Sequence, residues 1–167
     1  MDPFKIVVTG PVCAGKTTFI RTLSEDGIVS TEEQTTDAIE KDTTTVGLEL
    51  GRVTVQGRAT RLFGTPGQER FDYLWDIVAE GAEGCVLLCP ADRPTTCDRS
   101  LAFVRGLARE EGVPSVVGLT RCDLIPAEPT ELRTRLAPAG SAVSCLDARD
   151  HGDCESLLTD LVHTISE

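Results

Sequence analysis

The chain has 167 residues, of which 40% are hydrophobic and 26% are charged, a composition typical of a single globular domain. Its formal net charge of −11 argues against binding to nucleic acid or anionic lipid, since no basic cluster offsets it. No apolar run approaches the roughly 20 residues that a membrane-spanning helix needs. We therefore expect one domain, residues 1–167, in the cytoplasm and without a nucleic-acid partner.

Neither end of the sequence predicts a membrane anchor. Asp2 occupies the position where N-myristoylation requires glycine, and residues 164–167 do not form a prenylation box. If the protein reaches a membrane, we expect a partner protein to recruit it.

Cysteine is frequent, but its spacing does not indicate a metal site. The sequence has seven cysteines and no C-x-x-C pair, and several lie in apolar runs. We expect reduced thiols buried in the core. The seven are Cys13, Cys85, Cys89, Cys97, Cys122, Cys145 and Cys154.

Apolar runs typical of strands alternate with helical periodicity along the chain. Strands are expected over 4–9, 46–56, 58–63, 85–89, 115–120 and 142–145. Helices are expected over 16–24, 70–80, 96–111, 130–136 and 154–165. Gln56 and Gly57 predict a turn that joins the second and third strands into a hairpin.

This alternation predicts an α/β fold. Strands separated by helices form βαβ units, so we expect a six-stranded, mostly parallel sheet with helices on both faces. The hairpin would supply one antiparallel edge strand. Ligands of such sheets bind where strands end, so functional motifs should follow strands directly.

The segment Gly10–Thr17, Gly-Pro-Val-Cys-Ala-Gly-Lys-Thr, matches the phosphate-binding P-loop pattern G-x-x-x-x-G-K-[ST] between a strand and a helix. Backbone N–H groups and the helix N-terminus would bind phosphate, Lys16 would reach the β- and γ-phosphates, and the Thr17 hydroxyl would ligate Mg²⁺. A P-loop alone does not separate GTPases from ATPases or small-molecule kinases. The expected phosphate contacts here are Gly10, Val12, Cys13, Ala14, Gly15, Lys16, Thr17 and Thr18.

A second motif follows the predicted hairpin. Phe63–Arg70, Phe-Gly-Thr-Pro-Gly-Gln-Glu-Arg, resembles the D-x-x-G-Q-E switch II of Ras-family GTPases. The resemblance implies that the Gly67 N–H contacts the γ-phosphate and that Gln68 is catalytic, orienting the attacking water. Gly64 replaces the family's aspartate, so Mg²⁺ binds more weakly, or Asp92 or another acid substitutes. A plain surface loop is the alternative.

The segment Lys41–Gly47 resembles the end of switch I in Rab and Arf proteins. The resemblance implies that Thr45 ligates Mg²⁺ through its hydroxyl and meets the γ-phosphate through its N–H. Thr44 is a rival for this role, and an ordinary strand start is another interpretation. The preceding acidic stretch, 25–42, is either a mobile, solvated switch I or a surface for a basic partner.

Two further segments resemble the base-binding motifs of GTPases. Thr120-Arg121-Cys122-Asp123 replaces N-K-x-D, and Asp147-Ala148-Arg149 replaces S-A-K. The resemblance implies that Asp123 pairs with guanine N1–H and the 2-amino group and that Arg121 covers the base. A backbone N–H in 147–149 would read O6. Because threonine replaces asparagine at 120, we expect the hydrogen bond that ties this loop to the P-loop to be weakened or lost.

All five segments occur in the order found in GTPases, so the chain resembles a P-loop G domain of the Ras superfamily that binds GTP or GDP with Mg²⁺. Residues 63–71 resemble a prokaryotic, bacterial branch containing conservon-operon and gliding-polarity GTPases. That resemblance implies a regulator or effector of the Roadblock/LC7 family.

The expected function is a GTP-controlled molecular switch with slow hydrolysis. The sequence shows no clear internal arginine finger, and Val12 and Cys13 would crowd the γ-phosphate. One alternative is a guanine-nucleotide-binding scaffold that barely hydrolyses GTP. Another is a P-loop kinase that acts on a small molecule, although no lid insertion is evident.

Overall fold

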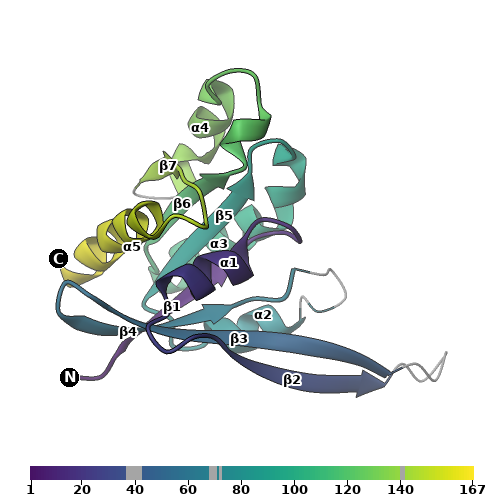
Figure 1. The fold of residues 1–167 in the computed structure, drawn as a ribbon, viewed down its shortest axis with the longest axis vertical. Helices are drawn as coiled ribbons and strands as arrows, with labels where there is room; N and C mark the ends of the chain where they lie inside the picture. The colour runs from purple at the N-terminus through teal and green to yellow at the C-terminus, as the bar shows by residue number, and fades with distance from the viewer. Residues whose placement is uncertain (37–42, 68–70, 72, 140–141) are drawn as a thin grey trace.

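The computed structural model of the chain describes residues 1–36, 43–67, 71, 73–139 and 142–167, without the side chains of 30–36, 43–47 and 139. One seven-stranded sheet runs through the described residues in the order β2-β3-β4-β1-β5-β6-β7 (Figure 1). The strands are β1 Phe4–Thr9, β2 Val29–Thr36, β3 Thr43–Val55, β4 Arg58–Gly64, β5 Gly84–Pro90, β6 Ser115–Thr120 and β7 Val143–Cys145.

The sheet confirms the predicted α/β architecture. The central pairs β1–β4, β1–β5, β5–β6 and β6–β7 are parallel, and β3 runs antiparallel to both of its neighbours. All six predicted strands are present. Gln56, with a φ of 51°, and Gly57, with a φ of 74°, form the expected turn between β3 and β4.

The seventh strand, β2, was not predicted. Residues 29–36 pair with β3 from Val29 opposite Leu50 to Thr36 opposite Thr43, so β2 rather than β3 forms the edge. Residues 29–36 thus form a strand that was not predicted, while the interpretation of 25–42 as a mobile, solvated switch I stays a prediction and 37–42 lie outside the described residues. The mostly polar sequence of β2 has no alternation of apolar and polar residues, so no strand was predicted there. The strand is defined instead by its backbone pairing with β3. The β2–β3 hairpin extends well beyond the helices (Figure 1).

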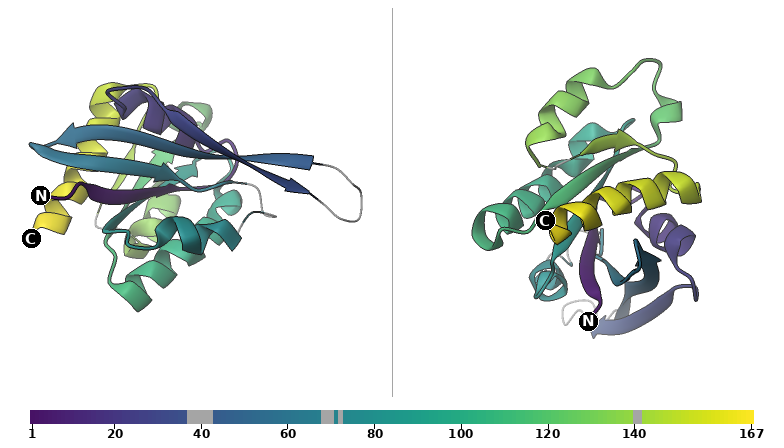
Figure 2. Two further views of the ribbon diagram at one scale, coloured as in Figure 1. Left: turned by 90° about the horizontal axis from the view of Figure 1, so that it is seen from below. Right: turned by 90° about the vertical axis from the view of Figure 1, so that its left-hand side faces the viewer.

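Helices cover both faces of the sheet, as predicted (Figure 2). Helices α1 and α5 pack on one face through Phe19, Ile20, Leu157 and Leu158. The other face is covered by α2, α3 and α4. The helices are α1 Lys16–Leu23, α2 Tyr73–Ala79, α3 Asp98–Glu111, α4 Thr130–Leu136 and α5 His151–Ser166, with short 3-10 turns η2 Pro94–Cys97, η3 Cys122–Leu124 and η4 Ala137–Ala139.

One expectation about the cysteines is wrong. Cys89, at the end of β5, and Cys97, in η2, are joined by a disulfide. The chain turns back after β5 and brings the two fully buried side chains together, a tertiary contact that their spacing did not reveal. The other five cysteines are free thiols.

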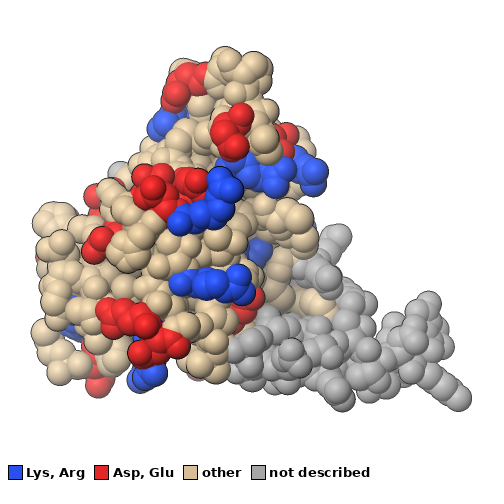
Figure 3. All heavy atoms as spheres, viewed as in Figure 1, with Lys and Arg blue, Asp and Glu red and all other residues tan. Residues whose placement is uncertain are grey.

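Charged side chains are spread over the described surface. On the face shown in Figure 3, positive and negative side chains are interspersed rather than gathered into one basic patch. Within the described residues, no helix is both long enough and apolar enough to cross a membrane.

Candidate functional site

Two adjoining pockets lie where parallel strands end. The first, of about 350 Å³, is lined by the P-loop, Glu49 and residues 64–67, and we call it the phosphate pocket. The second, of about 700 Å³, is lined by the P-loop and the loops after β6 and β7, and we call it the base pocket. Both include Cys13, Ala14, Gly15 and Thr18. The predicted motifs at 10–17, 63–67, 120–123 and 147–149 thus converge on one continuous site.

The P-loop backbone depends on close packing. Gly10 has a φ of 156°, and a Cβ atom there would lie 2.5 Å from the Leu88 carbonyl oxygen, so a larger residue would displace the loop from β5. The loop leads into α1 at Lys16. The first N–H groups of a helix have no intrahelical partner, and they therefore favour an anion at this end of α1.

Lys16 lies folded over its own loop. Its Nζ donates hydrogen bonds to the carbonyl oxygens of Gly10 at 2.6 Å and Pro11 at 2.8 Å. Burial lowers the pKa of Lys16 to about 8, and the charges of Glu49 and Cys13 oppose that shift. The partly buried ammonium lies in the phosphate pocket, where a phosphate oxygen would stabilise its charge.

Thr17 has a partner that the sequence did not predict. Its hydroxyl donates a hydrogen bond of 2.7 Å to Oε1 of Glu49 in β3. Glu49 lies opposite Gly64 in the β3–β4 register, at the point where the family's switch II aspartate is missing. Alternation along β3 could have shown that Glu49 shares a face with this site, but only the strand register shows that it reaches Thr17.

Switch II packs directly on the P-loop. A Cβ atom at Gly67 would lie 2.8 Å from the Val12 nitrogen and 2.9 Å from Lys16 Nζ, so glycine is needed for this approach. The Trp75 indole in α2 donates a 2.8 Å hydrogen bond to the Pro66 carbonyl oxygen. This bond links the segment 66–67 to α2. Gln68 lies outside the described residues.

Thr45 occupies the β2–β3 hairpin. Its backbone is paired with Gln34, and its neighbour and rival Thr44 is paired with Thr35. The side chains of both threonines lie outside the described part of the chain, so their predicted roles toward Mg²⁺ and γ-phosphate stay predictions.

The hydrogen bond between the base loop and the P-loop, which was expected to be weakened or lost, is present. The Thr120 hydroxyl donates a 2.8 Å hydrogen bond to the Ala14 carbonyl oxygen, and both residues are buried. The shorter threonine suffices because the end of β6 lies close to the P-loop: a Cβ atom at Gly15 would be 3.9 Å from Thr120 Cγ2.

Arg121 and Asp123 both line the base pocket. Arg121 has a φ of 60°, and its Nε donates a 2.9 Å hydrogen bond to Oδ1 of Asp92. Asp92 therefore holds the side chain predicted to cover the base, and it lines neither of the two pockets. Asp123 is the middle residue of the short turn η3, which begins directly after Arg121.

Opposite charges within the second base-binding segment, residues 147–149, hold its shape. Asp147 accepts hydrogen bonds from the Arg149 guanidinium and backbone N–H, and these hold the pKa of its carboxyl below the usual value. Ala148 accepts a 2.6 Å hydrogen bond from the Thr22 hydroxyl through its carbonyl oxygen. Its N–H makes no hydrogen bond with any residue that the structure describes, and all three residues line the base pocket.

Two thiols also line the base pocket. Cys122 Sγ lies 2.6 Å from Cys145 Sγ, and burial together with this contact raises the pKa of Cys122 to about 12. Arg133 approaches Cys145 at 3.4 Å. From the sequence we expected both cysteines to be core thiols, and their spacing did not predict that they lie in contact at this pocket.

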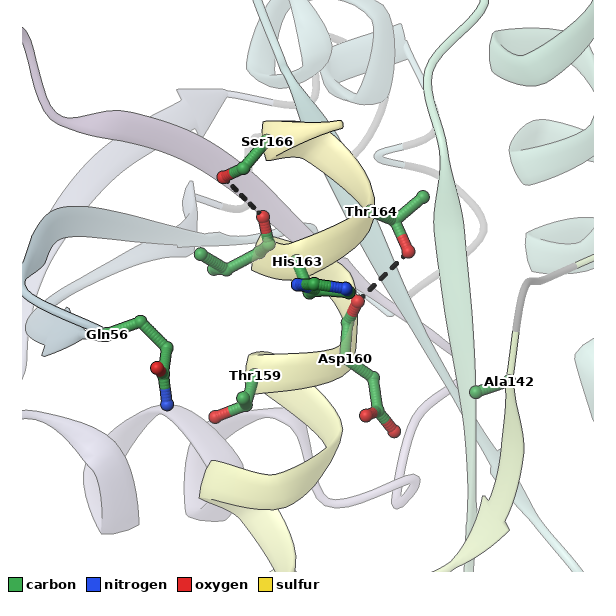
Figure 4. Close-up of a pocket in the computed structure, with 8 residues that line it drawn as sticks. Gln56, Ala142, Thr159, Asp160, His163, Thr164 and Ser166 are labelled. Carbon is green, nitrogen blue, oxygen red and sulfur yellow. Dashed lines mark hydrogen bonds between the residues drawn. The ribbon is translucent and has the colours of Figure 1, made fainter.

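A further hollow, of about 650 Å³, lies along the C-terminal half of α5 and includes Gln56 and Ala142 (Figure 4). The Thr164 and Ser166 hydroxyls there donate to carbonyl oxygens of α5 itself, those of Asp160 and Val162. None of the predicted site residues borders this hollow. Among the described residues, no group of three histidine, cysteine or acidic side chains could hold a metal ion.

The chain is similar in sequence to one family model and to one archaeal protein. The family model described as the Ras family matches residues 5–142. The chain is also 22% identical over 149 residues to a Methanocaldococcus jannaschii protein described as uncharacterized protein MJ1339. That alignment covers 89% of this chain and 90% of the archaeal one.

Proposed function

The chain belongs to the Ras family of small GTP-binding proteins, and on that premise we propose that it is a molecular switch set by GTP and GDP, with slow intrinsic hydrolysis. The observation that carries the proposal is the pair of adjoining pockets that share three P-loop residues and Thr18. One pocket has the size and lining for phosphates, the other for a base, and the shared residues leave the two continuous.

We propose that the P-loop residues 10 and 12–18 bind the phosphates, with Lys16 moving from its two carbonyl partners to the β- and γ-phosphate oxygens. In the base pocket, the Asp123 carboxylate would accept both N–H groups of the guanine edge, and the Ala148 N–H would donate to O6. Thr120, Arg121, Asp147 and Arg149 shape this pocket, and Asp92 orients Arg121. Adenine presents the opposite donor pattern, which disfavours it.

The residues around Thr17 suit Mg²⁺, because a hard cation prefers oxygen ligands and a hydroxyl and a carboxylate meet there. Thr17, and by the family pattern Thr45, would hold the ion. When bound, Mg²⁺ neutralises the charge that develops on the phosphate oxygens.

Hydrolysis would follow from water oriented by Gln68, with Lys16 and the Gly67 N–H stabilising the transferring phosphoryl group. Two features favour a slow reaction. The Val12 and Cys13 side chains line the phosphate pocket, and the described residues of that pocket include no arginine. An arginine supplied by a partner adds about 10³–10⁵ in rate in related sites.

We propose a cytoplasmic location and a protein partner of the Roadblock/LC7 family, from the resemblance of residues 63–71 to the bacterial polarity and conservon branch. The acidic stretch 25–42 favours a partner with a basic surface. Partner affinity should then fall with added salt and differ between GDP and a non-hydrolysable GTP analogue.

The deciding experiment identifies the nucleotide that co-purifies and then measures single-turnover phosphate release. Release from GTP and not ATP, accelerated by a partner, supports the switch. Guanine nucleotide retained without any turnover supports the scaffold instead. Transfer of phosphate to a small acceptor would identify a kinase and overturn the proposal.

A further inference from the structure

Switch II has no carboxylate at position 64 that could orient Thr17 or a water bound to Mg²⁺. Gly64 ends β4 in the position where related proteins have aspartate, and it lines the phosphate pocket beside Thr17. A glycine there has no group that could hold a water bound to Mg²⁺ or orient the Thr17 hydroxyl. Some other residue must do this if the site is to bind Mg²⁺ firmly.

The neighbouring strand β3 places a carboxylate close to Gly64. A Cβ atom at Gly64 would lie 3.6 Å from Glu49 Cβ, 3.8 Å from Glu49 Oε2 and 3.1 Å from Ile20 Cδ1. The Glu49 side chain is therefore in ordinary van der Waals range of the position that an aspartate side chain would start from, and only Ile20 Cδ1 is closer.

The contact with Thr17 sets the direction of its hydroxyl. Thr17 donates its single hydroxyl hydrogen to Glu49 Oε1 at 2.7 Å. A hydroxyl whose hydrogen is held in this way presents its lone pairs elsewhere, and a lone pair is what a cation needs. The second carboxylate oxygen of Glu49 stays on the side of Gly64 and the phosphate pocket.

Other acids do not compete for this role among the described residues. Glu49 is the acidic side chain that lines the described part of the phosphate pocket. Asp92 is held by Arg121 at the base side, 2.9 Å away.

From this geometry we propose that Glu49, reaching across from β3, replaces the switch II aspartate as the carboxylate that orients Thr17 and anchors a water of the Mg²⁺ ion. The proposal rests on the proposed function, since it requires a nucleotide and Mg²⁺ in this site. Glu49 is a positioning residue: it acts on the cation through Thr17 and water.

The test measures Mg²⁺ dependence rather than GTP turnover. A fluorescent GDP analogue is loaded on the whole chain, and its release is followed at increasing Mg²⁺ and in excess chelator. For E49Q, we expect the Mg²⁺ concentration that gives half-maximal retention to rise about tenfold to a hundredfold. In chelator, E49Q and the unmodified chain should release the analogue at the same rate. E49D keeps a carboxylate and should lie between the two.

Two further variants separate this role from a general charge effect. Glu83 is an exposed acid directly before β5, at the amino end of that strand and away from the phosphate pocket, and E83Q should retain the unmodified Mg²⁺ dependence. D92N should speed release equally with and without Mg²⁺, because Asp92 acts on Arg121 and the base. Thermal unfolding of the nucleotide-free E49Q variant checks that it folds.

The outcomes distinguish the two proposals. If the unmodified chain binds no guanine nucleotide, the proposed function fails. If it binds GDP with Mg²⁺-dependent retention and folded E49Q shows the same dependence, Glu49 is not the substitute. A Mg²⁺-specific loss in D92N instead would assign the role to Asp92 and overturn the proposal as well.

Discussion

The Thr120 hydroxyl donates a hydrogen bond to the Ala14 carbonyl oxygen at 2.8 Å, and this bond joins the base loop to the P-loop. Both residues are almost fully buried. The bond therefore couples the two halves of the nucleotide site, which arise from segments more than a hundred residues apart. Its strength is open to a direct test.

Replacing Thr120 with valine keeps the side-chain shape and leaves the buried Ala14 carbonyl without its donor. We expect the free energy of unfolding to fall by about 1–3 kcal/mol and bound GDP to dissociate faster. Urea unfolding and GDP release measure the two effects. T120S retains the hydroxyl and should keep most of the GDP retention. A valine variant as stable as the unmodified chain, with normal GDP release, would show that the bond contributes little.

Base selection should depend on Asp123. In D123A, two charge-assisted hydrogen bonds to guanine are lost, so GDP affinity should fall by at least about 2 kcal/mol, or roughly thirtyfold. ADP affinity should stay near its low value. Calorimetric titration with GDP and ADP measures the preference, and E131A, an exposed acid in α4, is the matched control. An unchanged preference for GDP would exclude Asp123 from base recognition.

The single tryptophan should report the state of switch II. Trp75 bonds to Pro66 and stacks edge-to-face on Phe103 with ring centroids 5.1 Å apart. Rearrangement of Gly67 around a γ-phosphate would change the environment of the indole. We expect its emission to differ between GDP and a non-hydrolysable GTP analogue, and W75F to abolish the signal. Identical spectra in the two states would argue that α2 does not follow switch II.

Burial of Cys85 should limit stability in alkali. Burial raises the pKa of this thiol from 9.0 to about 12, so the unfolded chain loses its proton first. The stabilisation is complete below pH 9 and is lost as the pH rises from 9 toward 12. Between pH 8 and 10.5 this thiol should cost about 2 kcal/mol of unfolding free energy.

C85A should therefore lose about 2 kcal/mol less than the unmodified chain over that pH interval, as measured by urea unfolding at both values. V86A, a truncation at the adjacent buried position, should lower stability equally at both pH values. Parallel declines in C85A and the unmodified chain would contradict the assignment of this titration to Cys85.

The sequence alone determined the features that depend on local patterns. The P-loop at Gly10–Thr17, the six apolar or alternating strands and the helices between them follow from short-range periodicity and turn residues, and the order of motifs identified the Ras family. Strand β2 was missed because its polar residues 29–36 carry no such pattern. Its hydrogen bonds come from β3.

Only the tertiary structure decided which distant groups meet. Glu49 reaches Thr17 because the β3–β4 register sets it opposite Gly64, and Thr120 reaches Ala14 because β6 ends beside the P-loop. Asp92 pairs with Arg121, and Cys89 bonds to Cys97, for the same kind of reason. The sequence shows which residue types are present at each position. Which of them contact one another depends on strand register and packing, and these are set by the whole sheet.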